Sequence, residues 1–172
     1  MKGRLAVLGF LFVLMPKPMF SCSCLWKTMP PADYDAAVVF RGTVTEKRTL
    51  LVRPEMPRRG RYAITFRVGE YWKGSRQATI VVYGLEDGTD CLGGSSYEVG
   101  AEYLVFASQE PSQDVLWPGS TTLWYSWTDV VPKGSPVLMT PACTPTGKVS
   151  ELFVRDAMNR LGRGSPPLAE AK

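Results

Sequence analysis

Alternation of apolar and polar residues along most of the chain predicts short β-strands. The clearest run covers residues 61–72, whose apolar side chains would share one strand face: Tyr62, Ile64, Phe66, Val68 and Trp72. Other runs rich in β-branched and aromatic residues predict strands over 37–45, 78–83 and 102–107, with weaker strands at 115–117 and 123–127.

Close to the C-terminal end the apolar residues recur at intervals of three and four, which predicts one helix over 149–161. Its apolar stripe would consist of Val149, Leu152, Phe153, Ala157 and Leu161. Ser150 is the expected cap, and Gly162 would end the helix. A short helix opened by Pro30 and Pro31 could run through Ala37.

Several short strands followed by one helix predict a mainly β fold, in which a small closed barrel carries the helix on its outside. The length of 172 residues supports a single domain with a sizeable core. The interpretation therefore divides the chain into residues 1–21, a folded domain over 22–161, and a flexible tail over 162–172 that contains Pro166 and Pro167.

Residues 1–21 are typical of an export signal. A basic start precedes an apolar run from Leu5 to Met15, which is too short to cross a bilayer stably. Cleavage after Ser21 would leave Cys22 at the mature N-terminus of a secreted or periplasmic protein. The minor alternative is a lipoprotein anchored at Cys22, because the preceding Met19-Phe20-Ser21 is a degenerate form of a lipidation box.

Charge and composition exclude several functions. The chain has no histidine, which excludes Ser-His-Asp and Cys-His nucleophile pairs and imidazole zinc sites. Lys2, Arg4 and Lys17 lie in the signal, so 20 basic side chains less these three leave 17 against 16 acidic ones. A net charge near +1 disfavours nucleic-acid binding by bulk electrostatics. We expect no cofactor, no membrane span and a monomer.

The four cysteines, Cys22, Cys24, Cys91 and Cys143, all follow the signal, so an oxidising compartment could pair every one. Lipidation of Cys22 would leave one of the others unpaired. Because Cys22 and Cys24 are one residue apart, each is expected to reach Cys91 or Cys143 instead of bridging its neighbour. Two long-range bridges would make an N-terminus rigid where termini normally fray.

Three further features have simple structural interpretations. Arginines cluster over residues 48–61 with two prolines, which indicates a solvated loop or a positive arm for an acidic partner.

Trp117, Trp124 and Trp127 are more typical of core packing than of a ligand platform, although Trp124 and Trp127 cannot share one strand face. Glu86, Asp87 and Asp90 indicate a polar turn, and we expect no enzyme activity.

The chain resembles the tissue inhibitors of metalloproteinases. The resemblance lies in an ordered set of segments: Cys22-Ser23-Cys24, Ala37 to Val44, Phe66 to Gly74, Cys91, Tyr97 to Ala107, and Ala142 to Thr146. It covers most of 22–161 and corresponds to the inhibitory domain alone, as in single-domain bacterial relatives. It implies a netrin-like module, a five-stranded OB-fold barrel, with bridges Cys22–Cys91 and Cys24–Cys143.

The resemblance also implies a mechanism. The amine and carbonyl of Cys22 would chelate the zinc of a metalloprotease, which keeps one position open for water. Ser23 would point into the first pocket beyond the metal, and Cys24 would continue along the protease cleft. A second contact would come from the loop over Tyr83 to Thr89, through Tyr83, Gly84 and Leu85. The alternative is a secreted or lipid-anchored netrin-like module that binds a protein or glycan and inhibits nothing.

Overall fold

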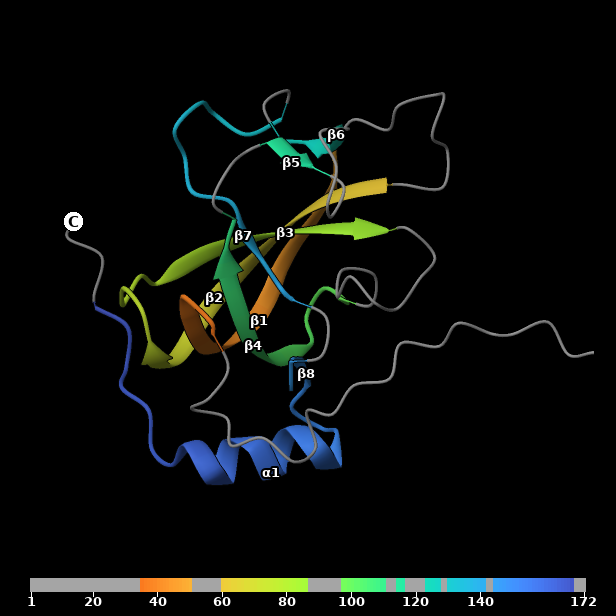
Figure 1. Cartoon of the computed structure of the whole chain (residues 1–172). Helices are drawn as coiled ribbons and strands as arrows, with labels where there is room; N and C mark the ends of the chain where they lie inside the picture. The colour runs from red at the N-terminus through yellow and green to blue at the C-terminus, as the bar shows by residue number, and fades with distance from the viewer. Residues whose placement is uncertain are drawn as a thin grey trace, which may run out of the picture.

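The computed structural model describes residues 35–50, 60–86, 97–110, 114–116, 123–127, 130–141 and 144–168. The predicted signal and all four cysteines lie outside these ranges. The elements in chain order are β1 (Val38–Thr49), β2 (Gly60–Lys73), β3 (Thr79–Glu86), β4 (Glu102–Gln109), β5 (Asp114–Leu116), β6 (Leu123–Ser126), β7 (Leu138–Met139), β8 (Gly147–Lys148) and α1 (Leu152–Leu161) (Figure 1).

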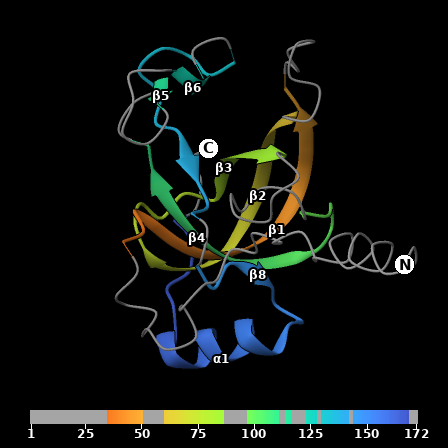
Figure 2. The ribbon, with the colours of Figure 1, turned by 45° about the vertical axis from the view of Figure 1, so that its right-hand side comes forward.

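Five strands close a barrel in the order β1-β2-β3-β7-β4, and β4 pairs with β1 to complete it. Every pairing is antiparallel except that of β3 with β7, which is parallel. The strand β8 continues the sheet from β4, whereas β5 and β6 form a separate two-stranded sheet. The prediction of a mainly β, OB-like barrel with one C-terminal helix is confirmed. Figure 2 shows β5 and β6 at the opposite end of the molecule from α1.

The barrel interior is apolar and rich in aromatic rings. Phe66 meets Phe40 edge to face at 5.3 Å between ring centroids and meets Tyr97 at the same distance. Tyr97 and Tyr103 lie 4.9 Å apart. Such edge-to-face pairs stabilise beyond the area they bury, so these rings fix the interior of the barrel.

The β2 strand does not keep one alternation along its length. Ile64, Phe66 and Val68 point into the barrel as predicted, but Gly69 has no partner on β1 in the register of the two strands. This β-bulge, and the next one, change the phase, so that Tyr71 lies in the barrel core and Trp72 packs on its outside. The prediction that Trp72 shares the face of Phe66 was wrong.

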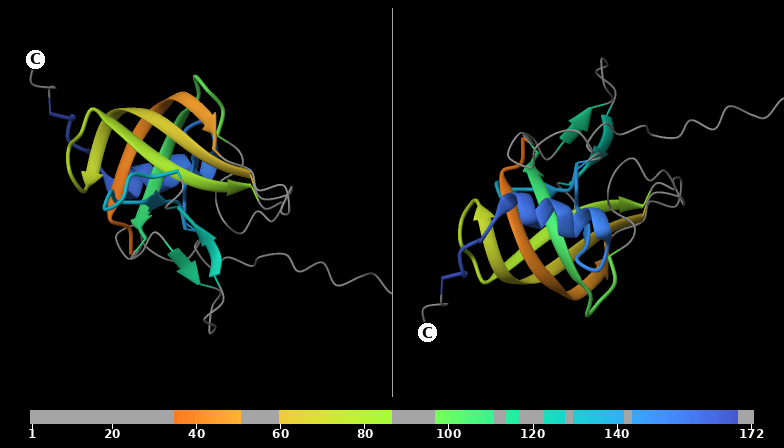
Figure 3. Two further views of the ribbon diagram at one scale, coloured as in Figure 1. Left: turned by 90° about the horizontal axis from the view of Figure 1, so that it is seen from above. Right: turned by 90° about the horizontal axis from the view of Figure 1, so that it is seen from below.

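The helix α1 packs on the outside of β1 and β4, where Val154 and Ala157 are buried with neighbours from both strands (Figure 3). It begins three residues later than predicted because Gly147 and Lys148 pair with β4, and the Val149 amide donates to the Glu102 carbonyl. Glu151, and not Ser150, is the capping residue, without a side-chain bond. Leu152 is 77% exposed, so it does not belong to the predicted stripe. Gly162 ends the helix with φ of 70°, as expected.

The segment after the helix is bound to the barrel, in contrast to the predicted flexible tail. We call residues 164–168 the strap. Ser165 and Tyr71 exchange two backbone hydrogen bonds of 2.7 Å, and the Arg76 guanidinium donates two more to the Pro166 carbonyl. The Trp72 indole N–H donates to the Gly162 carbonyl. These bonds hold the chain where β2 extends beyond its pairing with β3. Residues 169–172 lie outside the description.

The chain that enters β1 is extended. Residues 35–37 are not helical, so the described end of the predicted short helix is absent. Ala36 is buried beside α1, and the Ser108 hydroxyl donates to the Asp35 carbonyl at 2.8 Å. These contacts fix the point where the N-terminal segment reaches the barrel.

Candidate functional site

Of the predicted site residues, Tyr83, Gly84 and Leu85 are described, and they lie on β3 instead of in a loop. The strand continues to Glu86 because each of these residues pairs with β2, with Gly60 opposite Glu86 as the last pair. The remaining predicted residues, Cys22, Ser23, Cys24, Cys91 and Cys143, lie outside the described ranges.

Tyr83 is the residue at which β3 is held on both sides. It lies opposite Ala63 of β2 and next to Met139 of β7. Its ring is 5.4 Å from that of Trp127, and both belong to an apolar cluster with Val131 and Val137. Tyr83 is therefore packed into the barrel from both sides.

The parallel pairing of β3 and β7 has a consequence for the cysteines. Two parallel strands run toward the same end of a sheet, and here Met139 lies beside Tyr83, three residues before β3 ends at Glu86. Cys91 follows Glu86 by five residues, and Cys143 follows Met139 by four. The segments that carry the two cysteines thus begin toward the same end of the sheet, about 10 Å apart along the strand direction.

The residues that flank the two cysteines are buried as well. Tyr97 belongs to the barrel core, where burial raises the pKa of its phenol, and Thr140 is also buried. Tyr97 follows Cys91 by six residues, and Thr140 precedes Cys143 by three. The described flanks of both cysteines are therefore anchored to the barrel core.

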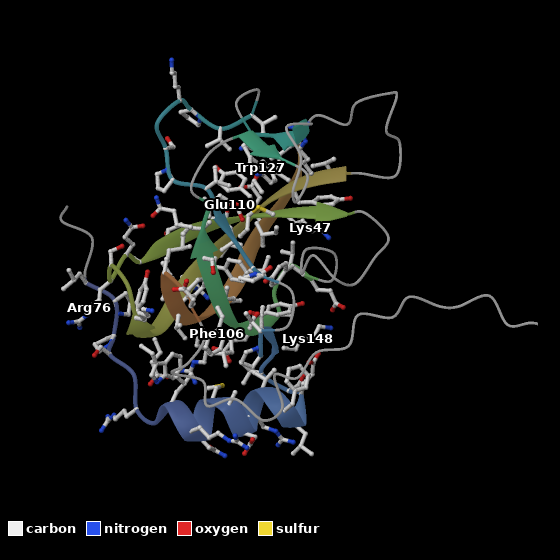
Figure 4. The ribbon with its side chains drawn as sticks, in the orientation of Figure 1. Lys47, Arg76, Phe106, Glu110, Trp127 and Lys148 are labelled. Carbon is white, nitrogen blue, oxygen red and sulfur yellow. The ribbon has the colours of Figure 1, made fainter. Side chains whose placement is uncertain are left out.

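Trp127 is the centre of a cluster on the outer side of β2 and β3, near the tips of these strands (Figure 4). It is fully buried, and the Arg61 guanidinium carbon lies 5.9 Å from its ring centroid. The connection from β4 to β7 thus folds back over the strands. Trp127 is core and cannot be a ligand platform.

Arg61 shows that the arginine-rich segment is not one solvated loop. Arg61 lies on β2 and is only 6% exposed, and Arg48 lies on β1. Arg48, Ala63 and Tyr83 form one row across three strands. Burial raises the pKa of the Tyr83 phenol, and the positive charge of Arg48 opposes this rise. The arginines at 53, 58 and 59 lie outside the described residues.

Sequence reasoning missed the pairing of Arg61 with Trp127, but a signal for it was present. If Tyr62, Ile64 and Phe66 point inward, then Arg61 and Ala63 point outward. A small apolar residue on an otherwise polar face, such as the buried Ala63, indicates that another segment covers it. Which segment covers it could not be predicted, because Trp127 is distant in sequence.

The described ranges contain no group of three or more Cys, Asp or Glu side chains that could hold a metal ion. Within the same ranges no helix has the length and apolarity needed to cross a bilayer. Of the three clustered carboxylates, Glu86 is the last residue of β3, whereas Asp87 and Asp90 are outside the description.

Comparison of the chain with protein-family models, with curated proteins and with solved structures finds no match.

Proposed function

We propose that this chain is an exported inhibitor of zinc metalloproteases that acts through a mature N-terminus at Cys22. The observation that carries the proposal is the parallel pairing of Tyr83 with Met139. Because β3 and β7 run in the same direction, the segments that carry Cys91 and Cys143 begin toward the same end of the barrel. Cys22 and Cys24 are one residue apart, so they need two partners that lie close to each other.

The chemistry follows from a clamped N-terminus. The α-amine has an ordinary pKa of about 7.7–8.0, so part of it is neutral near pH 7, and a metal ion displaces the remaining proton. The amine nitrogen and carbonyl oxygen of Cys22 would close a five-membered chelate on the protease zinc and displace its water. The sulfur of Cys22 would remain in its disulfide.

Rigidity is what would make this terminus an inhibitor and not a substrate. Two disulfides would remove much of the conformational entropy that a flexible peptide loses on binding. The end of β3 supports a second contact, because Tyr83 is held by β2, β7 and the buried Trp127. Ser23 and Cys24 would occupy the substrate cleft of the protease, next to the contact that this strand end would make.

One added residue tests the mechanism. A form with an extra alanine ahead of Cys22 replaces the chelating amine with an amide nitrogen. We expect it to lose inhibition, by at least about a hundredfold in the inhibition constant, because metal coordination carries several kcal/mol. The measurement is fluorogenic peptide cleavage by a panel of purified zinc metalloprotease catalytic domains.

The control is the form that begins at Cys22, with the same thermal unfolding midpoint and the same number of oxidised thiols as the extended form. Equal inhibition by both forms would show that zinc chelation is wrong. Failure of the Cys22 form against the whole panel would contradict inhibition and leave a binding module as the remaining function.

A further inference from the structure

The outer face of β1 and β2 carries two groups of charges with different surroundings. In the first group, Arg41 forms ion pairs with Glu70 at 3.6 Å and with Glu102 at 3.4 Å. Its members come from β1 and from the strands on either side of it, and each glutamate is paired with the same arginine. One arginine against two glutamates leaves this group with a net charge of −1.

The second group consists of Arg48, Glu46 and Arg67, and we call it the open charge row. All three side chains are exposed. Their side chains make no ion pair or hydrogen bond within the part of the chain that the structure describes. The row therefore presents three charged side chains without a bonded partner in the described ranges, on the outer face of the barrel.

The strand register fixes the order of these charges. Arg48 lies opposite Ala63, Glu46 opposite Thr65, and Arg67 opposite Thr43. Since 63, 65 and 67 are alternate residues of β2, successive charges are separated by about 7 Å along the strand direction. The signs alternate as positive, negative, positive. This spacing is close to the Debye length of about 8 Å at physiological salt, so a partner can distinguish the three signs.

We infer that the open charge row is a docking surface for a polypeptide that presents acidic, basic and acidic side chains at alternate positions of an extended strand. An arginine guanidinium matches a carboxylate in shape and charge, and strand residues two apart repeat at the same spacing as the row. Thr43 lies opposite Arg67 and Thr65 opposite Glu46, and both threonines are partly exposed.

Glu46 decides between this partner and a polyanion. A nucleic acid or a sulfated glycan carries negative charge at every step, so it would meet repulsion at the centre of the row. A polypeptide with a central lysine satisfies all three positions.

The test uses cyclised β-hairpin peptides as probes, titrated into the isotopically labelled exported protein and followed by amide chemical shifts. One peptide presents Glu, Lys and Glu on a strand face, the second presents Lys, Glu and Lys, and the third presents three glutamates. We expect the first to bind about fivefold more tightly than either of the others, since exposed ion pairs each contribute little. Its shifts should map to 43–48 and 65–67.

The matched variant reverses all three charges: Glu46→Arg, Arg48→Glu and Arg67→Glu. It should prefer the Lys, Glu, Lys peptide by a similar factor. A control variant with Arg155→Glu and Arg163→Glu, exposed positions in and after α1, should keep the original preference. No preference, tightest binding of the three-glutamate peptide, or shifts elsewhere on the barrel would overturn the inference.

This surface does not depend on zinc chelation. The form with an extra alanine ahead of Cys22 should therefore show the same peptide preference as the form without it. In the form that begins at Cys22, peptide preference without inhibition of any protease in the panel would show that only the proposed function has failed. Inhibition without peptide preference would show that only the docking surface has failed.

Discussion

At the scale of single residues, Trp127 is the side chain that most changes the interpretation of the sequence. It is fully buried against Tyr83, Arg61 and Val137, although it follows a short strand outside the barrel. Its ring connects the long segment between β4 and β7 to the outer side of β2 and β3. The rigidity of the proposed contact at Tyr83 therefore depends on a residue more than 40 positions away in sequence.

Replacing this ring tests that dependence. Trp127→Ala should lower the free energy of unfolding by about 3–5 kcal/mol, since a large buried ring leaves a cavity. Urea unfolding with disulfides intact, followed by far-ultraviolet circular dichroism, measures the change. Leu152→Ala is the control, because Leu152 is 77% exposed and its loss should change stability by less than about 0.5 kcal/mol. Equal effects in the two variants would contradict the packing described for Trp127.

At the scale of elements, the strap shows how the helix is joined to the barrel at both of its ends. Before α1, the pairing of β8 with β4 fixes the chain, and after it the strap bonds to β2 through Tyr71 and Ser165. Gly164 permits this close approach. A Cβ atom there would lie 2.8 Å from the Tyr71 carbonyl oxygen and nearer still to the Glu70 side chain.

Gly164→Ala should therefore displace the strap and leave the barrel folded. The Tyr71 amide, which donates to Ser165 at 2.7 Å, should exchange its hydrogen about tenfold faster, as expected for the loss of about 1.4 kcal/mol of local stability. Amide hydrogen exchange resolved by residue measures this. Leu168→Ala removes a 62% exposed side chain and should leave the Tyr71 rate unchanged. An unchanged rate in both variants would show that the strap does not need Gly164.

At the scale of the whole molecule, the barrel topology brings together segments that the sequence separates by about fifty residues. The β3–β7 pair is parallel, and parallel neighbours need a long connection. Here the connection contains β4, β5 and β6, and it returns the chain beside Tyr83. The two cysteines that follow these strands are the expected partners of Cys22 and Cys24.

The proposed function predicts the state of the exported protein. It should begin at Cys22, contain no free thiol, and yield after digestion without reduction the linked peptides Cys22–Cys91 and Cys24–Cys143, the pairing that the resemblance to the tissue inhibitors of metalloproteinases implies. Intact mass, N-terminal sequencing and peptide mapping together measure these properties. An acyl chain on Cys22, a different first residue or a bridge between Cys91 and Cys143 would each contradict the proposed chelating terminus.

The sequence alone was sufficient for four of the five barrel strands and for the existence of the helix, because their side chains repeat with periods that depend only on local geometry. The two-residue strand β7 was not predicted, because it is too short to show a period. Ile64, Phe66 and Val68 entered the core as the alternation predicts, and Gly162 ended the helix. The cysteine pattern and the proposed N-terminus also come from sequence, and the structure does not describe them.

Only the tertiary structure decided the features that depend on contacts between distant segments. The bulge at Gly69 turned Trp72 outward, β8 delayed the start of α1, and Tyr71 bound a tail whose prolines suggest a flexible end. The open charge row also needs the register of β1 with β2, which no local pattern specifies. Periodicity determines which face a side chain takes within one strand, whereas burial and register depend on which other strand or segment lies against it.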